Sequence, residues 1–249
     1  MKKYIIALDQ GTTGSQAILV DAQTFNFIDS VKEEYPQIYP KPSWVEHNLH
    51  DIWNSIENTT SKLLKKNNVA QNDIVCIGIT NQRETTCAFN KRGEPLCNAI
   101  VWQDRRTTEW CESHKSDEAM IKKKTGLPLD PYFSGTKMSW MLKNDSNVQL
   151  AKKNNDLCFG TIDTFLLYKL TSGHVHATEA SNASRTLLMN IESGSWDKDL
   201  LKYFEIPETA LPQIKDSFGH FGSTRGLSFL PDGVPITCLL GDQQAALFG

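Results

Sequence analysis

The chain has 249 residues, of which 39% are hydrophobic and 22% are charged, the mixture of a soluble globular protein. This length allows one large domain or two small ones, with a core of ordinary size. The formal net charge of −3 argues against a nucleic-acid surface, which normally carries a basic excess, and no apolar stretch reaches membrane-spanning length.

The first residues of the chain and its cysteines indicate the cell compartment. The first three residues lead directly into an apolar run without a signal-peptide pattern. The six cysteines are scattered, with no C-x-x-C pair, so reduced thiols in the cytoplasm are the plain interpretation. We therefore expect no membrane or nucleic-acid partner, and the sequence leaves open whether the full-length protein forms a homo-oligomer.

The first quarter of the chain is predicted to contain three strands and one helix. Apolar runs predict strands over residues 4–8, 17–21 and 27–35, and three prolines then break the pattern. Apolar residues at helical spacing predict an amphipathic helix over residues 49–66, with Asn48 as its N-cap.

The remaining predicted elements alternate buried strands with helices. They are a strand over residues 74–79, a hairpin through 91–93, a short strand over 99–102, helices over 107–124 and 161–170, the latter stopped by Gly173, and a last strand over 236–240. Because no internal repeat or low-complexity linker divides the chain, a single α/β domain is the simplest organisation.

Four of the buried strands end abruptly in polar clusters. These clusters are Asp9-Gln10, Arg83-Glu84, Gln103-Asp104 and Asp242-Gln243. In open α/β sheets, ligands bind at the carboxyl ends of the strands. The four clusters are therefore predicted to line one cleft.

The first cluster opens a hairpin whose tip can cradle phosphate. Residues 9–16, D-Q-G-T-T-G-S-Q, do not form a Walker A loop, and a strand rather than a helix follows them. Gly11 and Gly14 allow a tight turn, while backbone N–H groups and the hydroxyls of Thr12 and Thr13 can donate to anionic oxygens. A carboxylate at Asp9 beside phosphate implies Mg²⁺, held largely through water. The alternative is an ordinary glycine-containing hairpin.

The D-Q-G-T-T motif (9–13) resembles the phosphate loop of the actin-like ATPase superfamily, and six further motifs together resemble those of the FGGY carbohydrate kinases. The six are N-Q-R-E-T-T (81–86), W-Q-D-R-R (102–106), D-P-Y-F-S-G-T-K-M-S-W-M-L (130–142), G-T-I-D-T-F-L-L-Y-K-L-T (160–171), N-A-S-R-T (182–186) and G-D-Q-Q-A-A-L-F-G (241–249). The resemblance runs from Tyr4 to Gly249 and implies an α/β fold of the actin-like ATPase (ribonuclease H-like) type, a mixed sheet flanked by helices. It also implies that residues 1–249 are the amino-terminal substrate and phosphate-loop domain, and that the second actin-like domain, with most adenosine contacts, is absent from this chain.

The resemblance further implies an activity and a role for each site residue. The reaction is transfer of the γ-phosphoryl group of ATP to a terminal hydroxyl of glycerol, giving glycerol 3-phosphate, with Mg²⁺ as the metal. Its implied residues are Arg83, Glu84, Trp102, Tyr132, Asp242 and Gln243 for glycerol, Thr12, Thr13, Gly14 and Gln16 for the nucleotide, and Asp9 for the metal. Asp242 is also the implied catalytic base, because a carboxylate is the usual proton acceptor in kinases.

Each of these residues also has an ordinary structural interpretation. Adjacent Arg83 and Glu84 can be a solvated surface pair, Trp102 a core aromatic and Tyr132 a loop packing residue. Asp242 is a good N-cap for a helix that begins at Gln243. Trp140 is interpreted as core packing, and no catalytic role is assigned to Lys137.

Two positions depart from the family pattern. Gly14 stands where Ser or Thr is usual, and Gln16 stands where an arginine usually reaches the nucleotide phosphates. A neutral amide cannot supply that charge, so we expect a weaker hold on phosphate unless another cation substitutes. Arg105 and Arg106 are long enough to do so, but the sequence does not place them.

Two other functions remain open from the sequence. One is a sibling kinase that acts on another polyol or sugar, which a larger pocket without the arrangement of Arg83, Glu84 and Trp102 would favour. The other is a non-catalytic binding fragment, which Gln16 and the absence of the second domain favour for this chain.

Overall fold

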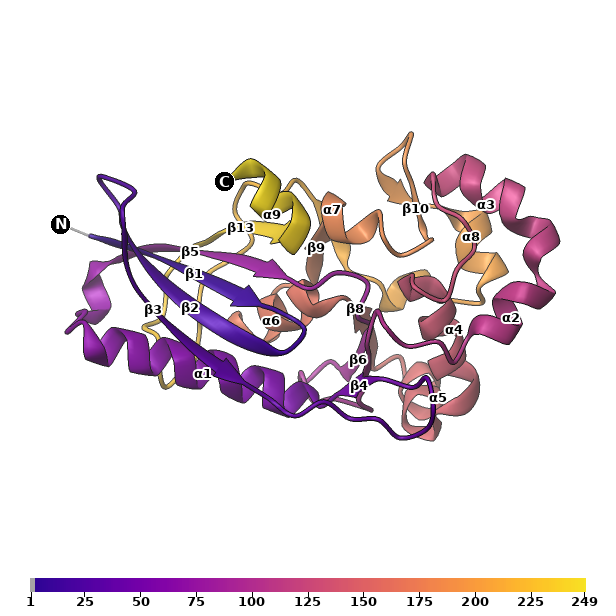
Figure 1. The fold of residues 1–249 in the computed structure, drawn as a ribbon, viewed down its shortest axis with the longest axis horizontal. Coiled ribbons are helices and arrows are strands. Elements are labelled where there is room, and N and C mark those ends of the chain that lie inside the picture. The colour runs from indigo at the N-terminus through magenta and orange to yellow at the C-terminus, as the bar shows by residue number, and fades with distance from the viewer. Residues whose placement is uncertain (1–2) are drawn as a thin grey trace.

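A computed structural model describes residues 3–249 and places a β-sheet at one end of the molecule and a largely helical region at the other (Figure 1). The strands β1 (Tyr4–Gln10) and β5 (Ile74–Asn81) run from the amino terminus toward the junction of the two regions (Figure 1). Their carboxyl ends therefore lie where the sheet meets the helices. No helix within the described residues is both long and apolar enough to cross a membrane.

The remaining strands and the helices are distributed along the whole described chain. The remaining strands are β2 (Gly14–Asp21), β3 (Phe27–Glu34), β4 (Glu46–His47), β6 (Cys87–Asn90), β7 (Ala99–Ile100), β8 (Leu157–Gly160), β9 (Ala177–Glu179), β10 (Met189–Asn190), β11 (Ser195–Trp196), β12 (Gln213–Lys215) and β13 (Ile236–Gly241). The α-helices are α1 (Leu49–Lys66), α2 (Thr108–Ser113), α3 (Glu118–Thr125), α4 (Ser134–Asn144), α5 (Ser146–Lys153), α6 (Ile162–Leu170), α7 (Ala180–Ala183), α8 (Lys198–Tyr203) and α9 (Asp242–Phe248), and 3₁₀ turns cover Gln71–Asp73, Lys115–Asp117 and Glu208–Ala210.

The main sheet is mixed and has the strand order β13-β5-β1-β2-β3. β1 pairs in parallel with β5, and β5 pairs in parallel with β13, whereas β1–β2 and β2–β3 are antiparallel. In this register Gln10 lies opposite Asn81, and Asn81 lies opposite Gly241. Three strand ends with polar residues are thus brought to one edge of the sheet.

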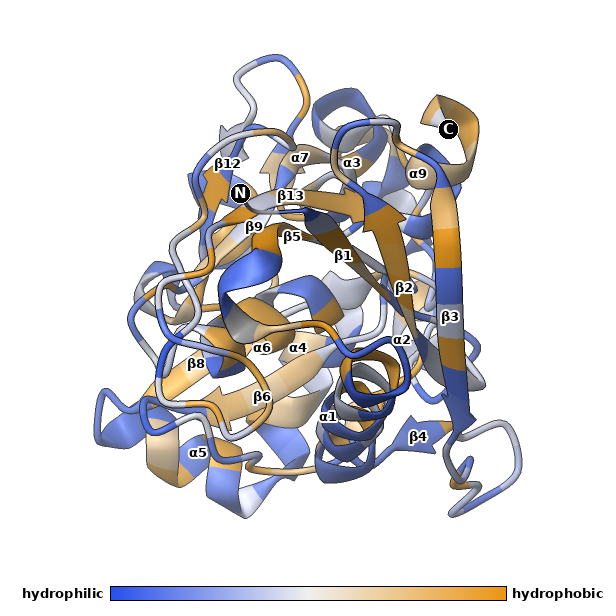
Figure 2. Cartoon of the chain, turned by 90° about the vertical axis from the view of Figure 1, so that its left-hand side faces the viewer, coloured by the Kyte–Doolittle hydropathy of each residue, from blue (hydrophilic) through white to orange (hydrophobic). Residues whose placement is uncertain are grey.

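One face of this sheet is buried by α1 and α6. Alternate strand residues such as Ile6, Leu19 and Ile77 are fully buried and share a cluster with Ile56 of α1 and Phe165 of α6. Figure 2 shows α1 and α6 on the same side of the apolar strands. Since strand side chains alternate between faces, the residues between them, which include Asp9 and Gln16, lie on the opposite face.

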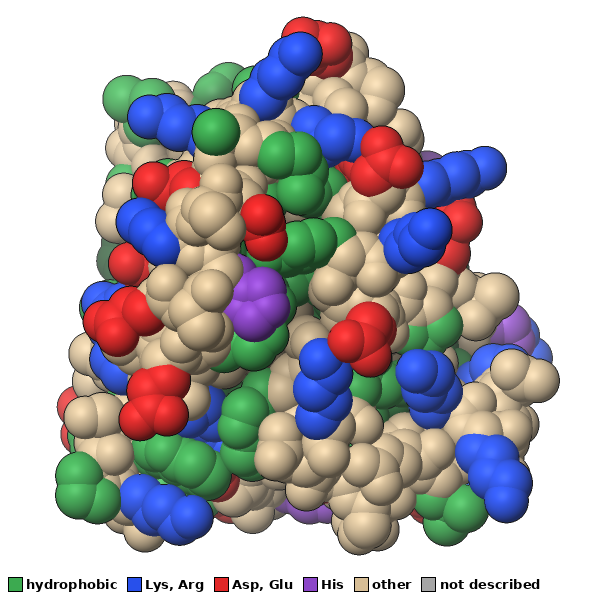
Figure 3. Space-filling view, turned by 90° about the vertical axis from the view of Figure 1, so that its right-hand side faces the viewer, with side chains coloured by type: hydrophobic (Ala, Val, Ile, Leu, Met, Phe, Trp, Pro, Cys, Tyr) green, Lys and Arg blue, Asp and Glu red, His purple; other side chains and the backbone are tan. Residues whose placement is uncertain are grey.

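A second apolar cluster forms the helical region, where it joins α2 to α5 with α8. Above this cluster the Arg106 guanidinium is buried between the rings of Trp44 and Trp140, at 3.8 and 4.7 Å from their centroids. It also pairs with Asp104 and Glu46, at 2.8 and 2.7 Å. Trp140 is half-buried and packs against this cluster rather than within it, so the core position that the sequence indicates is only partly correct. On the face of this end seen in Figure 3, acidic and basic side chains are interspersed.

Most predicted elements are confirmed, with bounds that shift by a few residues. α1 spans residues 49–66 as predicted, and the Asn48 side chain accepts a hydrogen bond from the His50 amide at 2.8 Å. α6 ends at Leu170, and Gly173, at a φ of +80°, donates its amide to Tyr168 at 2.8 Å. The predicted strand over 99–102 is confirmed only for β7, because the chain turns at Trp102.

The single helix predicted over residues 107–124 is wrong. α2 ends at Ser113, a 3₁₀ turn follows, and α3 begins at Glu118. Ser116 and Asp117, residues of lower helix propensity, stand in this 3₁₀ turn. The predicted turn at 91–93 is present, with the Gly93 amide bonded to the Asn90 carbonyl at 2.8 Å. However, the main partner of β6 is β8, in which Cys158 lies opposite Phe89, 69 positions earlier in the chain.

We predict that Asp104→Asn lowers the free energy of unfolding by about 2–4 kcal/mol, because it removes the charge that balances a buried guanidinium. Asp104 is 1% exposed and accepts bonds from the Val45 amide and from Arg106. Urea denaturation of this chain measures the change. Glu205→Gln, which removes the exposed partner of Lys143, is the matched control and should have little effect. Equal effects of the two substitutions would contradict this view of the Arg106 cluster.

Candidate functional site

The site is built where β1, β5 and β13 end, and a buried polar network holds these ends together. The Asn81 amide at the end of β5 bonds to the Asn182 side chain of α7 at 2.9 Å. Ser181, also in α7, accepts the Gly241 amide at 2.8 Å, and Glu179 accepts the Ser181 and Asn182 amides at 2.7 Å each. The short helix α7 therefore fixes the position from which Asp242 leaves the sheet.

The hairpin tip at residues 11–14 presents its carbonyls to the protein. The Gly11 carbonyl accepts bonds from Gln10 and Tyr35 at 2.7 and 2.5 Å, and the Thr12 carbonyl accepts one from Gln37 at 3.0 Å. Within residues 3–249, the amides of Thr12 and Thr13 donate no hydrogen bond. The tip thus offers free N–H groups, which is the arrangement that suits an anion.

Beneath the tip lies a row of neutral buried side chains. Gln82 contacts Gln10 and Tyr35, and His47 bonds to Gln37 at 2.6 Å. Burial lowers the pKa of His47 to about 4, so its ring is uncharged at neutral pH. These side chains set the shape of the tip without adding charge to it.

The segment Arg83-Glu84 follows β5 in a strained three-residue turn. The Thr85 amide bonds to the Arg83 carbonyl at 2.7 Å, and Glu84 has a φ of +60°, which is unusual for a residue with a side chain. Such conformations persist only where the surroundings enforce them, and they cluster at functional sites. The turn points two adjacent charged side chains into the protein, which excludes the solvated surface pair.

Glu84 is held by a residue to which the sequence analysis gave no role. Its carboxylate, 2% exposed, accepts the Arg185 Nε at 2.5 Å, while no hydrogen bond from residues 3–249 reaches its Oε2. The Arg185 guanidinium lies over the rings of Tyr132 and Phe133, at 5.7 and 4.9 Å from their centroids. Arg185 stands in the N-A-S-R-T motif, but 101 residues separate it from Glu84, and no local pattern links the two.

Trp102 joins the hairpin tip to the Arg83–Glu84 turn. Its Nε1 donates to the Thr12 hydroxyl at 2.9 Å, and its ring meets the Tyr132 ring edge-on at 5.7 Å. Trp102 is half-buried rather than a core residue. The aromatic pair and the hairpin tip consequently form one continuous surface.

Asp242 completes this surface, but it does not cap a helix as expected. Helix α9 begins at Asp242 itself and Gly241 is the N-cap residue, so the predicted helix start at Gln243 is wrong. The Asp242 carboxylate accepts the Gln243 amide at 2.7 Å and lies 3.7 Å from the Arg83 Nε. This carboxylate is 45% exposed, so it is accessible to a ligand.

The structure brings most of the predicted substrate residues together, with the exception of Gln243. The Gln243 side chain is exposed and makes no hydrogen bond within residues 3–249. Next to it, Gln244 Oε1 and Arg83 Nε are buried without a hydrogen-bond partner among the described residues. Both lie against Gly241, where a Cβ would come within 2.4 Å of Arg83 and 3.1 Å of Gln244. Such unpaired buried groups are rare in folded proteins.

Asp9 and Asp242 lie at the same edge of the sheet and are the carboxylates there that could help to hold a cation. Burial and the negative charge of Asp242 raise the pKa of Asp9, while the charge of Lys32 opposes that rise. No group of three or more His, Cys, Asp or Glu residues gathers as a metal site in the described chain. Two carboxylates agree with Mg²⁺, which keeps several of its waters.

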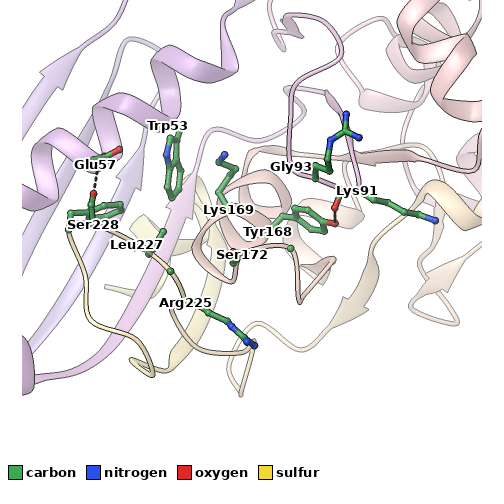
Figure 4. Close-up of a pocket in the computed structure, with 14 residues that line it drawn as sticks. Trp53, Glu57, Lys91, Gly93, Tyr168, Lys169, Ser172, Arg225, Leu227 and Ser228 are labelled. Atoms are coloured by element: carbon green, nitrogen blue, oxygen red, sulfur yellow. Dashed lines mark hydrogen bonds between the residues drawn. The ribbon is translucent and has the colours of Figure 1, made fainter.

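A separate cavity of about 390 Å³ lies away from this edge, between α1, α6 and the loop at residues 225–229 (Figure 4). Lys91, Lys169 and Arg225 line it, and the Glu57 carboxylate beside it accepts a bond from Ser228 at 2.7 Å. None of the predicted site residues contributes to this cavity.

Comparisons with known proteins agree with the fold. The structure superimposes on the crystal structure of Plasmodium falciparum glycerol kinase with ADP with a TM-score of 0.92 and 34% identity, covering 98% of this chain and 49% of that protein. The fold is therefore that of an actin-like kinase domain. The model of the N-terminal domain of the FGGY family of carbohydrate kinases matches residues 4–249, and the chain belongs to this family.

Curated relatives match at about half of their length. Glycerol kinase of Bdellovibrio bacteriovorus is 51% identical over 252 residues, which cover 100% of this chain and 51% of that protein. Glycerol kinase of Desulforamulus reducens is 49% identical over 251 residues, which cover 100% of this chain and 50% of that protein. The chain thus spans about half the length of the relatives it matches.

Lys137 lies under the site and gives a pH-dependent prediction. It is fully buried, its ammonium donates to the Tyr132 carbonyl, and burial lowers its pKa to about 7. In the unfolded chain the pKa is near the ordinary value of about 10.4, so between about pH 7 and 10 the unfolded state binds more protons. Stability therefore rises with pH in that window, by up to about 1.4 kcal/mol per unit.

Urea denaturation of the wild type and of Lys137→Met at pH 7.5 and pH 9 tests this. Between pH 7.5 and pH 9, the free energy of unfolding should rise by about 1–2 kcal/mol more for the wild type than for Lys137→Met. Loss of the bond to Tyr132 affects both pH values alike and does not imitate the effect. Parallel pH profiles would mean that Lys137 stays charged in the folded protein.

Proposed function

We propose that this chain is the substrate-binding half of an ATP-dependent kinase that phosphorylates glycerol. The observation that carries the proposal is the continuous surface made by the free amides of the hairpin tip, the Trp102–Tyr132 pair and the charged residues Arg83, Glu84 and Asp242. A small polyol needs donors, acceptors and one apolar wall, and all three are present within this surface. Family membership and glycerol kinase relatives at about 50% identity support the same assignment.

In the proposed complex, two neighbouring hydroxyls of glycerol are recognised by opposite partners. Arg83, whose Nε is unpaired, donates to one, and the free Oε2 of Glu84 accepts from another. Arg185 orients the Glu84 carboxylate, while Trp102 and Tyr132 cover the carbon chain. Because a buried polar group left unpaired is costly, a substrate without these hydroxyls should bind poorly.

Asp242 is the proposed base. It accepts the proton of a terminal hydroxyl as the oxygen of that hydroxyl bonds to the γ-phosphorus, and ADP leaves with the electrons of the broken P–O bond. Arg83 beside it keeps the carboxylate oriented. ATP would supply the phosphoryl group, and Mg²⁺ bound with it would offset part of the negative charge of the phosphates. The amides of Thr12 and Thr13 and the Thr12 hydroxyl hold phosphate oxygens, with Asp9 on the metal side.

Several of the sequence predictions remain predictions. They are the cytoplasmic location, the absence of nucleic-acid and membrane partners, the homo-oligomer and the role of Gln243. We also expect residues 1–249 alone to bind glycerol without useful ATP turnover, because most adenosine contacts in the family pattern come from a second domain. A sibling activity on another polyol is the second candidate function, and it would need more room for the acceptor beside Trp102.

A coupled kinase assay tests the proposal directly. The full-length gene product that carries this chain should release ADP with glycerol in preference to a panel of longer polyols and sugars. A larger kcat/KM for a longer polyol would replace glycerol with that substrate. If no acceptor caused ADP release, the protein would be a non-catalytic binding module rather than a kinase.

We predict that Asp242→Asn lowers kcat about 10²–10⁴-fold, the usual effect of removing a general base. The change keeps the size of the side chain and its bond to the Gln243 amide, so the KM for glycerol should change far less. Steady-state kinetics of the full-length protein measure both constants. A kcat near that of the wild type would restrict Asp242 to a structural role at the start of α9.

A further inference from the structure

Three side chains cross the sheet in a row beside the hairpin tip. Asp9 of β1 lies opposite Gln16 of β2, and Gln16 lies opposite Lys32 of the edge strand β3. Directly opposed residues of antiparallel strands share a face. The row therefore runs carboxylate, amide, ammonium along the face of the sheet that α1 does not cover.

The opposite face of β3 confirms the direction of Lys32. Asp29 and Glu33 pair with Lys66 and Lys62 of α1, at 2.8 and 2.6 Å. Because side chains alternate along a strand, Lys32 lies on the other face, the one that carries Asp9. Its charge acts on Asp9, yet among the residues that the structure describes its ammonium has no ion pair or hydrogen bond.

The other cations near the strand ends are already engaged. Arg105 pairs with Asp130 at 2.8 Å, and Arg106 is buried between two tryptophans with two carboxylates. Arg83 is 9% exposed and lies against Asp242. Neither arginine that the sequence suggested as a substitute is therefore free to reach the hairpin tip.

Gly14 explains how β3 comes close to the tip. A Cβ at Gly14 would lie 2.5 Å from the Glu33 carbonyl oxygen and 3.0 Å from the Glu34 Cα, closer than real side chains approach backbone. Only glycine allows this approach, and the Tyr35 amide then reaches the Thr13 carbonyl at 3.3 Å. The two departures from the family pattern, at positions 14 and 16, thus belong to one arrangement in which the edge strand sits against the tip.

We propose that Lys32 supplies the positive charge for nucleotide phosphate that position 16 lacks, from the neighbouring strand. This inference rests on the proposed function. Neighbouring strands are about 4.8 Å apart, and the flexible four-carbon stem of a lysine spans one such gap. Compared with an arginine at position 16, the positive charge of Lys32 lies on the next strand of the sheet. It acts as a point charge, whereas an arginine would be a bidentate donor.

Acidic neighbours make this charge more necessary. Glu34 lies opposite Gly14 on the same face, and Asp9 and Asp242 lie at the strand ends. Lys32 is the cation in this row, and it offsets part of that negative charge before phosphate arrives.

The test compares Lys32→Gln with Lys62→Gln, which removes a lysine paired with Glu33 on the opposite face. In the full-length gene product, calorimetric titration with Mg²⁺-ATP should give a Kd about 3- to 10-fold higher for Lys32→Gln, and an unchanged Kd for Lys62→Gln. The difference should shrink as salt screens the charge. The KM for glycerol should stay constant.

A rescue variant separates charge from folding. The double variant Gln16→Arg with Lys32→Gln places a positive charge on β2 in place of the one removed from β3. It should restore the wild-type Kd for Mg²⁺-ATP. An unchanged Kd for Mg²⁺-ATP in Lys32→Gln would overturn the inference, and so would a weaker affinity that Gln16→Arg does not restore. Neither result would affect the proposed function, provided that the wild type phosphorylates glycerol. Absence of both ATP binding and activity in the wild type would overturn the proposed function, and this inference with it.

Discussion

The parallel register of β1, β5 and β13 is the constraint on which the site depends. It places Gln10, Asn81 and Gly241 in one row, so the residue before or after each of them lies at the same edge. Asp9, the turn at Arg83-Glu84 and Asp242 are separated by up to 233 positions in the chain. A shift of one residue in any of these pairings would turn the corresponding side chains to the other face of the sheet.

The register alone does not fix the side chains, and buried contacts from α4 and from α7 with the residues after it supply the rest. Arg185 follows α7 and holds Glu84, Lys137 in α4 holds the loop of Tyr132, and Ser181 in α7 holds Gly241. The strained backbone at Glu84 is stable because buried partners surround it on both sides. The helical region is thus the scaffold for the substrate side of the site, and the sheet is the scaffold for the phosphate side.

How far the sequence could predict this arrangement depends on the range of each interaction. Local signals located α1 with its Asn48 cap, the buried strands and the hairpin tip, because periodicity and turn residues report short-range structure. They failed at residues 107–124, where a helical pattern hid the break at Ser116 and Asp117. Of the four polar clusters predicted to line one cleft, those at Asp9-Gln10, Arg83-Glu84 and Asp242 meet at one edge of the sheet, because parallel strands bring such ends together. The fourth does not, since Asp104 pairs with Arg106.

Long-range contacts were out of reach of the same signals. The pairing of Glu84 with Arg185 joins residues 101 apart, and nothing in either segment specifies the other. Lys32 was equally hidden, because its position beside Gln16 follows from the pairing of β2 with β3 rather than from its own neighbours. Asp242 was placed correctly at a strand end but was expected to cap α9, and the helix instead begins one residue earlier.

The most direct test of the account is a crystal structure of this chain soaked with glycerol. Glycerol should lie against Trp102, with one hydroxyl on Arg83, one on the free oxygen of Glu84, and a terminal hydroxyl within hydrogen-bond distance of Asp242. Glycerol bound only in the cavity beside Trp53, or no glycerol between Trp102 and Asp242, would contradict the assignment of the strand-end edge as the substrate site.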